Sequence, residues 1–164
     1  MQSNHEGYER ASGLLAVARS MLTQLATERN AGHFAQALGL EGAIVTTVKP
    51  GLWEHWKSSE EGCKLYVVES VGIEQDTFRP QVAYTALYGE HVGQMTFRHL
   101  TDEGFGFLTP INRPDARYVG PRFIFVRALT PIQRTILRVE AHRIALATHR
   151  EEALQTIGLI LECF

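Results

Sequence analysis

Residues 79–100, RPQVAYTALYGEHVGQMTFRHL, constrain the fold of this chain more than any other stretch, because they predict a β-hairpin. Their apolar and aromatic side chains alternate in two sets that would lie on opposite sheet faces, with Val82, Tyr84, Ala86 and Tyr88 in one set and Met95, Phe97 and His99 in the other. Gly89 and Gly93 flank the expected tip, where a tight turn requires positive φ. The hairpin therefore indicates an antiparallel sheet at the centre of the chain.

The N-terminal part predicts one long helix and one short helix. Between about residue 4 and residue 29, apolar side chains recur at alternating spacings of three and four, which is the pattern of a helix with one buried face: Tyr8, Ala11, Leu15, Ala18, Leu22 and Leu25. A second, short helix is expected over residues 32–38, and Gly39 is its expected end. Such a wide apolar stripe requires a packing partner.

Further strands are predicted on both sides of the hairpin, at residues 43–48, 64–71, 105–108 and 123–127. In the segment KLYVVESV, β-branched and aromatic residues alternate with others, so one face is expected to be buried. Pro50 and Gly51 are expected to end the first of these strands. The following segment, WEHWKSSEEG, is expected to be too polar for the core, and INRPDARYVGPR, with its prolines and arginines, is expected to be an ordered surface loop.

The C-terminal part begins with residues that are typical of the N-terminus of a helix. Thr130 is a suitable N-cap, Pro131 fits the first helical position, and Gln133 stands where a capping-box partner belongs. The helix either continues to about residue 162 or breaks near Thr148, where a second capping-box pattern occurs, and the sequence leaves both possibilities open.

Together these elements predict an α+β fold. A small, mostly antiparallel curled sheet or an SH3-like barrel is expected at residues 41–128, flanked by a helical N-terminal arm at residues 1–40 and a long helical C-terminal arm at residues 129–164. The chain has 164 residues, a length that favours one cooperative unit. The terminal helices are expected to pack on each other, on the sheet, or on a second copy, which makes a homo-oligomer the expected assembly.

Charge excludes some classes of partner. The net charge is −2, so bulk electrostatics favour neither duplex nucleic acid nor membrane as a partner, and no apolar run is long enough to span a bilayer. The charge is nevertheless uneven. Residues 51–110 hold four basic and nine acidic side chains, whereas residues 111–127 hold four arginines and one aspartate. Cys63 and Cys163 form no metal-binding or redox motif, and the first residues do not resemble a secretion signal, so a cytoplasmic protein is expected.

Several residues of the middle segment resemble a small bacterial and phage family of unknown function. The matching residues are His55, Trp56 and Lys57, then Tyr66, then Tyr84, Ala86, Leu87, Tyr88 and Gly89, and finally Arg98 and Leu100. The resemblance covers about residues 51–108, with Thr85 in place of the family's arginine and His99 in place of its proline. It implies a compact β-rich middle domain and assigns no catalytic residue.

Motifs of common enzymes are absent from the sequence, which contains no GxSxG, no HExxH, no GxGxxG and no P-loop. Glu90, His91 and His99 form the best candidate metal set, since they would converge at the tip of the hairpin, and His55 is a further candidate ligand. The simpler interpretation is that these histidines are solvated turn and edge residues.

The basic segment after residue 110 is the best candidate for ligand binding. Guanidinium groups bind phosphate through paired hydrogen bonds, and aromatic faces stack on a base. The predicted ligand-binding residues are Arg113, Arg117, Arg122, Tyr118, Trp56, His55, Tyr88 and Arg98. The competing interpretation is that these arginines form solvated ion pairs with the acidic segment, residues 51–110.

The sequence therefore favours a non-enzymatic protein that binds a small anionic, nucleotide-like ligand, needs no cofactor, and forms a homo-oligomer through its helices. Two alternatives stay open. One is a protein-interaction adaptor whose helical arms are the binding surface, and the other is a metal-dependent enzyme that uses Glu90, His91 and His99.

Overall fold

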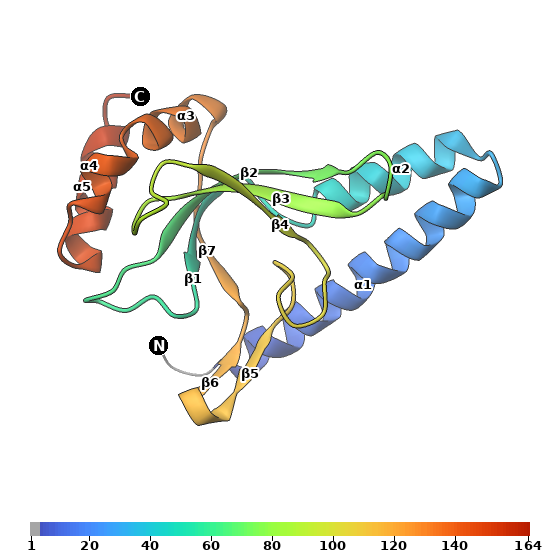
Figure 1. Cartoon of the computed structure of the whole chain (residues 1–164), viewed down its shortest axis with the longest axis horizontal. Coiled ribbons are helices and arrows are strands. Elements are labelled where there is room, and N and C mark those ends of the chain that lie inside the picture. The colour runs from blue at the N-terminus through green and yellow to red at the C-terminus, as the bar shows by residue number, and fades with distance from the viewer. Residues whose placement is uncertain (1–3) are drawn as a thin grey trace.

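A computed structural model describes residues 4–164 and shows an α+β fold built on one antiparallel sheet (Figure 1). The sheet has five strands in the order β4-β3-β2-β1-β7, and their bounds are Gly51–His55 (β1), Leu65–Ile73 (β2), Pro80–Ala86 (β3), Met95–His99 (β4) and Phe123–Ala128 (β7). The fold class is confirmed. Strands β4 and β7 are the two free edges of the sheet. The sheet is therefore open and curled, and it does not close into the SH3-like barrel that was the other predicted form.

The hairpin forms as predicted from strands β3 and β4. Tyr84 pairs with Thr96 and Val82 with Arg98, which places the alternating sets of residues on opposite faces. Gly89 and Gly93 have φ values of 77° and 80° in the connecting turn. Only glycine adopts such values without steric cost, and this explains why both ends of the tip carry this residue.

Strand β1 corrects the prediction for residues 43–62. Residues 43–45 belong to a helix and residues 46–48 form a turn, whereas Gly51–His55, which the sequence analysis placed outside the core, pairs with β2 on one side and β7 on the other. Leu52 is fully buried, and the polar Glu54 is buried as well. At Gly51 an added Cβ would lie 2.3 Å from the backbone oxygen of Arg127, so the approach of β7 requires glycine here.

Helices α1 (His5–Asn30) and α2 (Phe34–Val45) form an antiparallel pair that extends beyond the sheet (Figure 1). Asn4 caps α1 by accepting a hydrogen bond from the Gly7 amide at 2.7 Å. Helix α2 is longer than predicted, because Gly39 does not end it. Ile44 packs in the core beside Leu25 of α1, and this burial outweighs the strand propensity of the segment that contains it.

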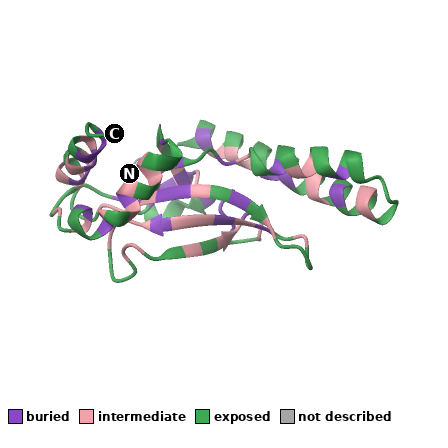
Figure 2. Ribbon diagram, turned by 90° about the horizontal axis from the view of Figure 1, so that it is seen from above, coloured by how far each residue is buried: buried purple, intermediate pink, exposed green. Residues whose placement is uncertain are grey.

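Both faces of the sheet are covered, which corrects the expectation that β2 buries one face. Val68 and Val71 pack with α1 and α2, whereas Leu65 and Val67 pack with the C-terminal helices. A bulge between Val68 and Ser70 adds one residue to β2. Because of this extra residue, valines three positions apart lie on one face. Figure 2 shows buried and intermediate residues along the central strands.

The C-terminal arm is three helices, not one rod: α3 (Pro131–Val139), α4 (Ala141–Ala145) and α5 (Arg150–Leu161). The predicted capping box of Thr130 and Gln133 is present. The second break falls near Thr148, as the sequence allowed, but His149 is the cap and accepts a hydrogen bond from the Glu152 amide. No helix in residues 4–164 is long and apolar enough to cross a membrane.

Residues 105–122 differ from the prediction in two places. Residues 105–108 form turns instead of a strand, with buried Phe107 and Leu108 filling the core. The expected loop at residues 111–122 contains a small hairpin, made of β5 (Ile111–Arg113), the 3-10 turn η1 (Pro114–Ala116) and β6 (Tyr118–Gly120). Strand β6 contacts the start of α1, where the Asn4 amide donates to the Val119 carbonyl at 2.6 Å.

Candidate functional site

A cavity of about 340 Å³ lies between the end of β1 and the β5–β6 hairpin. We call it the basic cavity, and its lining residues include His55, Trp56, Lys57, Arg113 and Arg122. Gly104 and residues 110–112 complete the lining. Of the described residues that line it, none is a carboxylate, a cysteine or a serine. The cavity therefore presents hydrogen-bond donors and positive charge, which is the chemistry of an anion site.

Stacked aromatic rings hold the two walls of the basic cavity together. The rings of Trp56 and Tyr118 are 5.1 Å apart and nearly parallel, and both side chains are buried with Ile111. The Trp56 amide donates to the Arg122 carbonyl at 2.9 Å, and the Tyr118 hydroxyl donates to the Pro121 carbonyl at 2.7 Å. These contacts fix Arg122 beside the end of β1.

Arg122 is held by backbone carbonyls and not by a carboxylate. Its Nε donates to the Thr109 carbonyl at 3.1 Å and its Nη2 to the Gly104 carbonyl at 2.5 Å. Burial and the nearby Arg98 lower the pKa of this guanidinium. Both effects oppose the charged form, so the site keeps a cation in a position where its charge is costly.

Arg98 adds a second cation without a carboxylate partner. Its Nη1 donates to the Phe105 carbonyl at 2.8 Å, and its buried Nε has no hydrogen-bond partner among the described residues. The ion pairs formed within residues 4–164 include neither Arg98 nor Arg122, and they include neither Lys57 nor Lys64. The charges of Arg98, Arg122, Lys57 and Lys64 are therefore not neutralised by a paired side chain in the described part of the chain.

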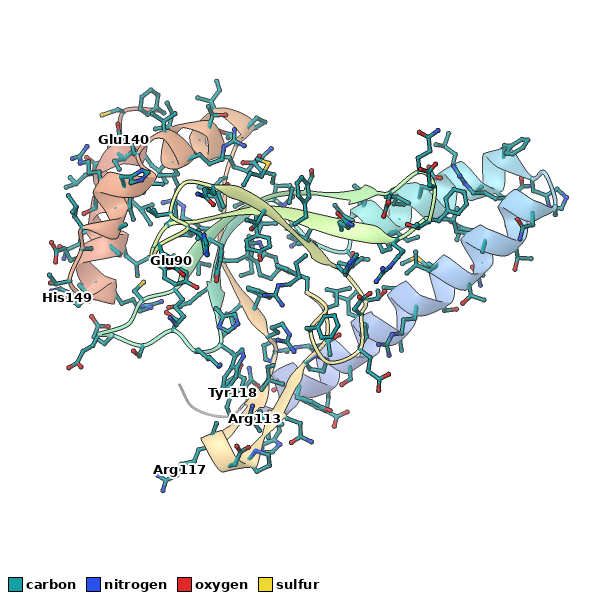
Figure 3. All side chains as sticks on the ribbon, viewed as in Figure 1. Glu90, Arg113, Arg117, Tyr118, Glu140 and His149 are labelled. Carbon is teal, nitrogen blue, oxygen red and sulfur yellow. The ribbon has the colours of Figure 1, made fainter. Side chains whose placement is uncertain are left out.

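The other two arginines of the predicted set lie differently. Arg113 lines the basic cavity but also forms a two-fold ion pair with Asp115, with distances of 2.9 and 2.8 Å, and this pair lowers the pKa of Asp115 to about 2. Arg117 occupies the left-handed region with φ of 56° at the end of η1 and is exposed. Figure 3 shows its side chain directed away from the rest of the molecule. Arg117 does not line the cavity.

The pKa of His55 reflects the positive charges around the cavity. Its pKa is lowered from 6.5 to about 4, first by burial and then by the positive charges of Arg98, Arg122, Lys57 and Lys64. The ring is therefore neutral at neutral pH. Its Nδ1 accepts a hydrogen bond from the Lys57 amide at 3.2 Å, so we assign the ring proton to Nε2, which leaves that nitrogen as a donor. A neutral imidazole donor suits a site that binds an anion.

The lowered pKa predicts how stability depends on pH. An unfolded histidine titrates near 6.5 and His55 in the folded protein near 4, so between these values the unfolded chain binds more protons. Stability is therefore expected to fall as pH drops through this range. His55→Asn keeps an acceptor for the Lys57 amide but cannot be protonated. Its free energy of unfolding, measured with urea across the range, is expected to depend less steeply on pH than that of the wild type, and equal slopes would contradict this expectation.

The remaining sequence candidates are not part of this cavity. Tyr118 is buried beneath Trp56, so its ring stacks on protein, and Tyr88 lines a separate cavity. Glu90 and His91 lie in the turn at one end of β4, whereas His99 ends the strand at the other, so the predicted convergence of the three is wrong. No group of three potential metal ligands occurs within residues 4–164.

Sequence reasoning identified His55, Trp56, Arg113 and Arg122 and missed Lys57 as a ligand-binding candidate. Lys57 adjoins two of them in the segment EHWK, whose polar composition suggests a segment outside the core. Tyr66 and Tyr84, which line the separate cavity that contains Tyr88, were also missed as ligand-binding candidates, although both stand in the alternating pattern of their strands. Neither a protein-family model, nor a curated protein, nor a solved structure matches this chain.

Proposed function

We propose that this protein binds a small anion of the phosphate class in the basic cavity. The observation that carries the proposal is the pair Arg122 and Arg98, two half-buried guanidinium groups that donate to carbonyls and have no carboxylate partner in the described part of the chain. Arg122 lines the cavity, whereas Arg98 is not a lining residue but lies close enough to lower the pKa of Arg122 and of His55. A partly desolvated cation without a counter-charge is unfavourable. A bound phosphate supplies that charge and accepts charge-assisted hydrogen bonds.

The lining residues support binding more than chemistry. Lys57 adds positive charge at the rim, where its side chain is exposed, and neutral His55 offers an N–H donor. The charge of Arg113 is already balanced by Asp115. Among the described lining residues none is a carboxylate, a cysteine or a serine, and His55 is the lining side chain suited to act as a base. Self-association through the helices and the adaptor alternative stay predictions. The metal-dependent alternative loses its ligand set, because His99 lies at the opposite end of β4 from Glu90 and His91.

Calorimetric titration of inorganic phosphate into the whole chain at pH 7 and low ionic strength tests the proposal. We expect one saturable site with a dissociation constant on the order of 1 mM or tighter, which corresponds to about −4 kcal/mol. Added NaCl should weaken binding, because the site is open to solvent and salt screens it. Heats that equal dilution at phosphate concentrations well above this constant would contradict the proposal.

A further inference from the structure

A second cavity, of about 380 Å³, lies on the hairpin near its tip. We call it the tyrosine cavity, since Tyr66, Tyr84 and Tyr88 line it together with Ala86 and Gly89. All three tyrosines are half-buried, so their rings are neither core nor free surface. The structure therefore holds three aromatic rings around a space that protein atoms do not fill.

Strand register explains why the space exists. Ala86 lies between Tyr84 and Tyr88 on the same face of the hairpin, and it pairs directly with Tyr66 of β2. Its small methyl group leaves room for the Tyr66 ring, which contacts the rings of both neighbours. The rings of Tyr84 and Tyr88 stand edge-to-face against Tyr66, at centroid distances of 5.2 and 5.4 Å and interplanar angles of 74° and 88°. The three rings therefore form an aromatic wall of the tyrosine cavity. We call the space in front of this wall the slot, where a flat ring can pack against the tyrosines.

The slot also offers a hydrogen-bond donor. The hydroxyl groups of Tyr66 and Tyr88 are hydrogen-bonded to each other. Two hydroxyls carry two hydrogens, and one is used between them, so the second is available to donate to a ligand atom. Burial and this contact raise the pKa of Tyr66, so its hydroxyl keeps its hydrogen. A heterocycle with ring nitrogens or carbonyl oxygens provides the matching acceptor.

Charge around the tyrosine cavity favours a ring attached to an anion. The Lys64 ammonium lies 4.8 Å from the centre of the Tyr88 ring, and Arg98 acts electrostatically on Tyr66. Glu90 at the rim is exposed. Aromatic cages also bind ammonium groups, but two neighbouring cations disfavour that occupant here.

The tyrosine cavity and the basic cavity lie along one face of the sheet. His55, which lines the basic cavity, contacts the Phe123 ring at 5.2 Å, and the same Phe123 ring contacts Tyr66 at 5.7 Å. One aromatic ring therefore separates the two linings. Figure 3 labels Glu90, which lines the tyrosine cavity, and Arg113, which lines the basic cavity. A ligand with a phosphate at one end and a heterocycle at the other matches this layout.

We propose that the ligand is a nucleoside monophosphate, with its phosphate in the basic cavity and its base in the tyrosine cavity, against the rings of the three tyrosines. This inference rests on the proposed function, because the basic cavity must bind the phosphate. Stacking of a base on aromatic side chains is tolerant of base identity, so more than one nucleotide is expected to bind. The hydroxyl pair of Tyr66 and Tyr88 would then set any preference among bases.

The test compares inorganic phosphate, ribose 5-phosphate and the four ribonucleoside 5′-monophosphates by calorimetric titration of the whole chain. At least one nucleotide is expected to bind about tenfold tighter than ribose 5-phosphate, because only the base distinguishes them. If phosphate and ribose 5-phosphate bind but no nucleotide binds tighter, this inference is wrong and the proposed function stands. If none of the probes binds, both are wrong.

The variant Ala86→Phe tests whether the base binds in the tyrosine cavity. The larger side chain fills the slot, so it is expected to remove the nucleotide's advantage over ribose 5-phosphate and to leave phosphate affinity unchanged. Ala83→Phe is the matched control, since Ala83 lies on the same strand and faces the opposite side of the sheet. A nucleotide advantage that survives Ala86→Phe would place the base elsewhere and overturn the inference. The comparison of ligands on the wild type decides the question even if the variant does not fold.

Discussion

Arg122→Gln is expected to weaken phosphate binding at least about 30-fold, to a level that calorimetry does not detect. The guanidinium of Arg122 lies between the two walls of the basic cavity and has no carboxylate partner in residues 4–164, so an anion is its natural counter-charge. Removing one member of a partly buried charge interaction costs on the order of 2–5 kcal/mol. Glutamine retains an amide donor for the Thr109 or Gly104 carbonyl, so the fold should persist.

Arg117→Gln is the control for this experiment. It removes the same charge from the same short segment, but Arg117 is exposed and lies outside the cavity lining. The two variants therefore share any general effect of net charge. Phosphate affinity is expected to stay within about threefold of the wild type in Arg117→Gln, since exposed charges are screened by salt. Equal losses in both variants would show that diffuse charge, and not the basic cavity, attracts the anion.

Arg150→Ala is expected to lower the free energy of unfolding by about 3 kcal/mol. Both carboxylate oxygens of Glu54 accept hydrogen bonds from Arg150, at 2.8 and 3.0 Å, and Ser58 donates to the same carboxylate at 2.6 Å. Glu54 is only 5% exposed. The variant leaves this carboxylate buried without its counter-charge. We expect the lower end of the usual range, because 35% of the Arg150 side chain is exposed.

Urea denaturation of three variants checks this stability prediction. Arg143→Ala is the control, since Arg143 and Glu140 form an exposed pair at 3.8 Å, and it should cost no more than about 0.5 kcal/mol. Adding Glu54→Gln to Arg150→Ala should recover part of the lost stability, because a neutral amide is easier to bury than a carboxylate. If Arg150→Ala costs no more than Arg143→Ala, the buried pair does not hold α5 against β1.

The hairpin was predictable because its determinants are local. Alternation sets the faces of β3 and β4, and the glycines of the turn carry the positive φ values that the sequence required. Strand β1 was not predictable in this way, because it lies in the middle of the sheet with both faces covered. Its polar residues are explained by distant partners, such as Arg150 for Glu54, which are 96 positions apart in the chain. Residues 43–45 were mistaken for a strand because the contact of Ile44 with α1 decides their conformation.

The sequence predicted which types of residue form the candidate site, but it did not predict how these residues are arranged in space. The sequence indicated a basic aromatic segment, but only the fold shows that Arg122 lines a cavity, that Arg113 is paired with Asp115, and that Arg117 points outward. The tyrosine cavity depends on the register that pairs Tyr66 with Ala86. Such pairings join residues far apart in the chain, so periodicity within one segment cannot reveal them.

The pKa of His55, measured by NMR titration of its ring resonances with and without saturating phosphate, tests the central claim most directly, because His55 lines the basic cavity itself. In the free protein the account predicts a value of about 4, well below the ordinary 6.5. A bound phosphate places negative charge beside the ring and is expected to raise this pKa by at least about one unit. A pKa that phosphate leaves unchanged, or a free-protein value near 6.5, would contradict the presence of an anion site here.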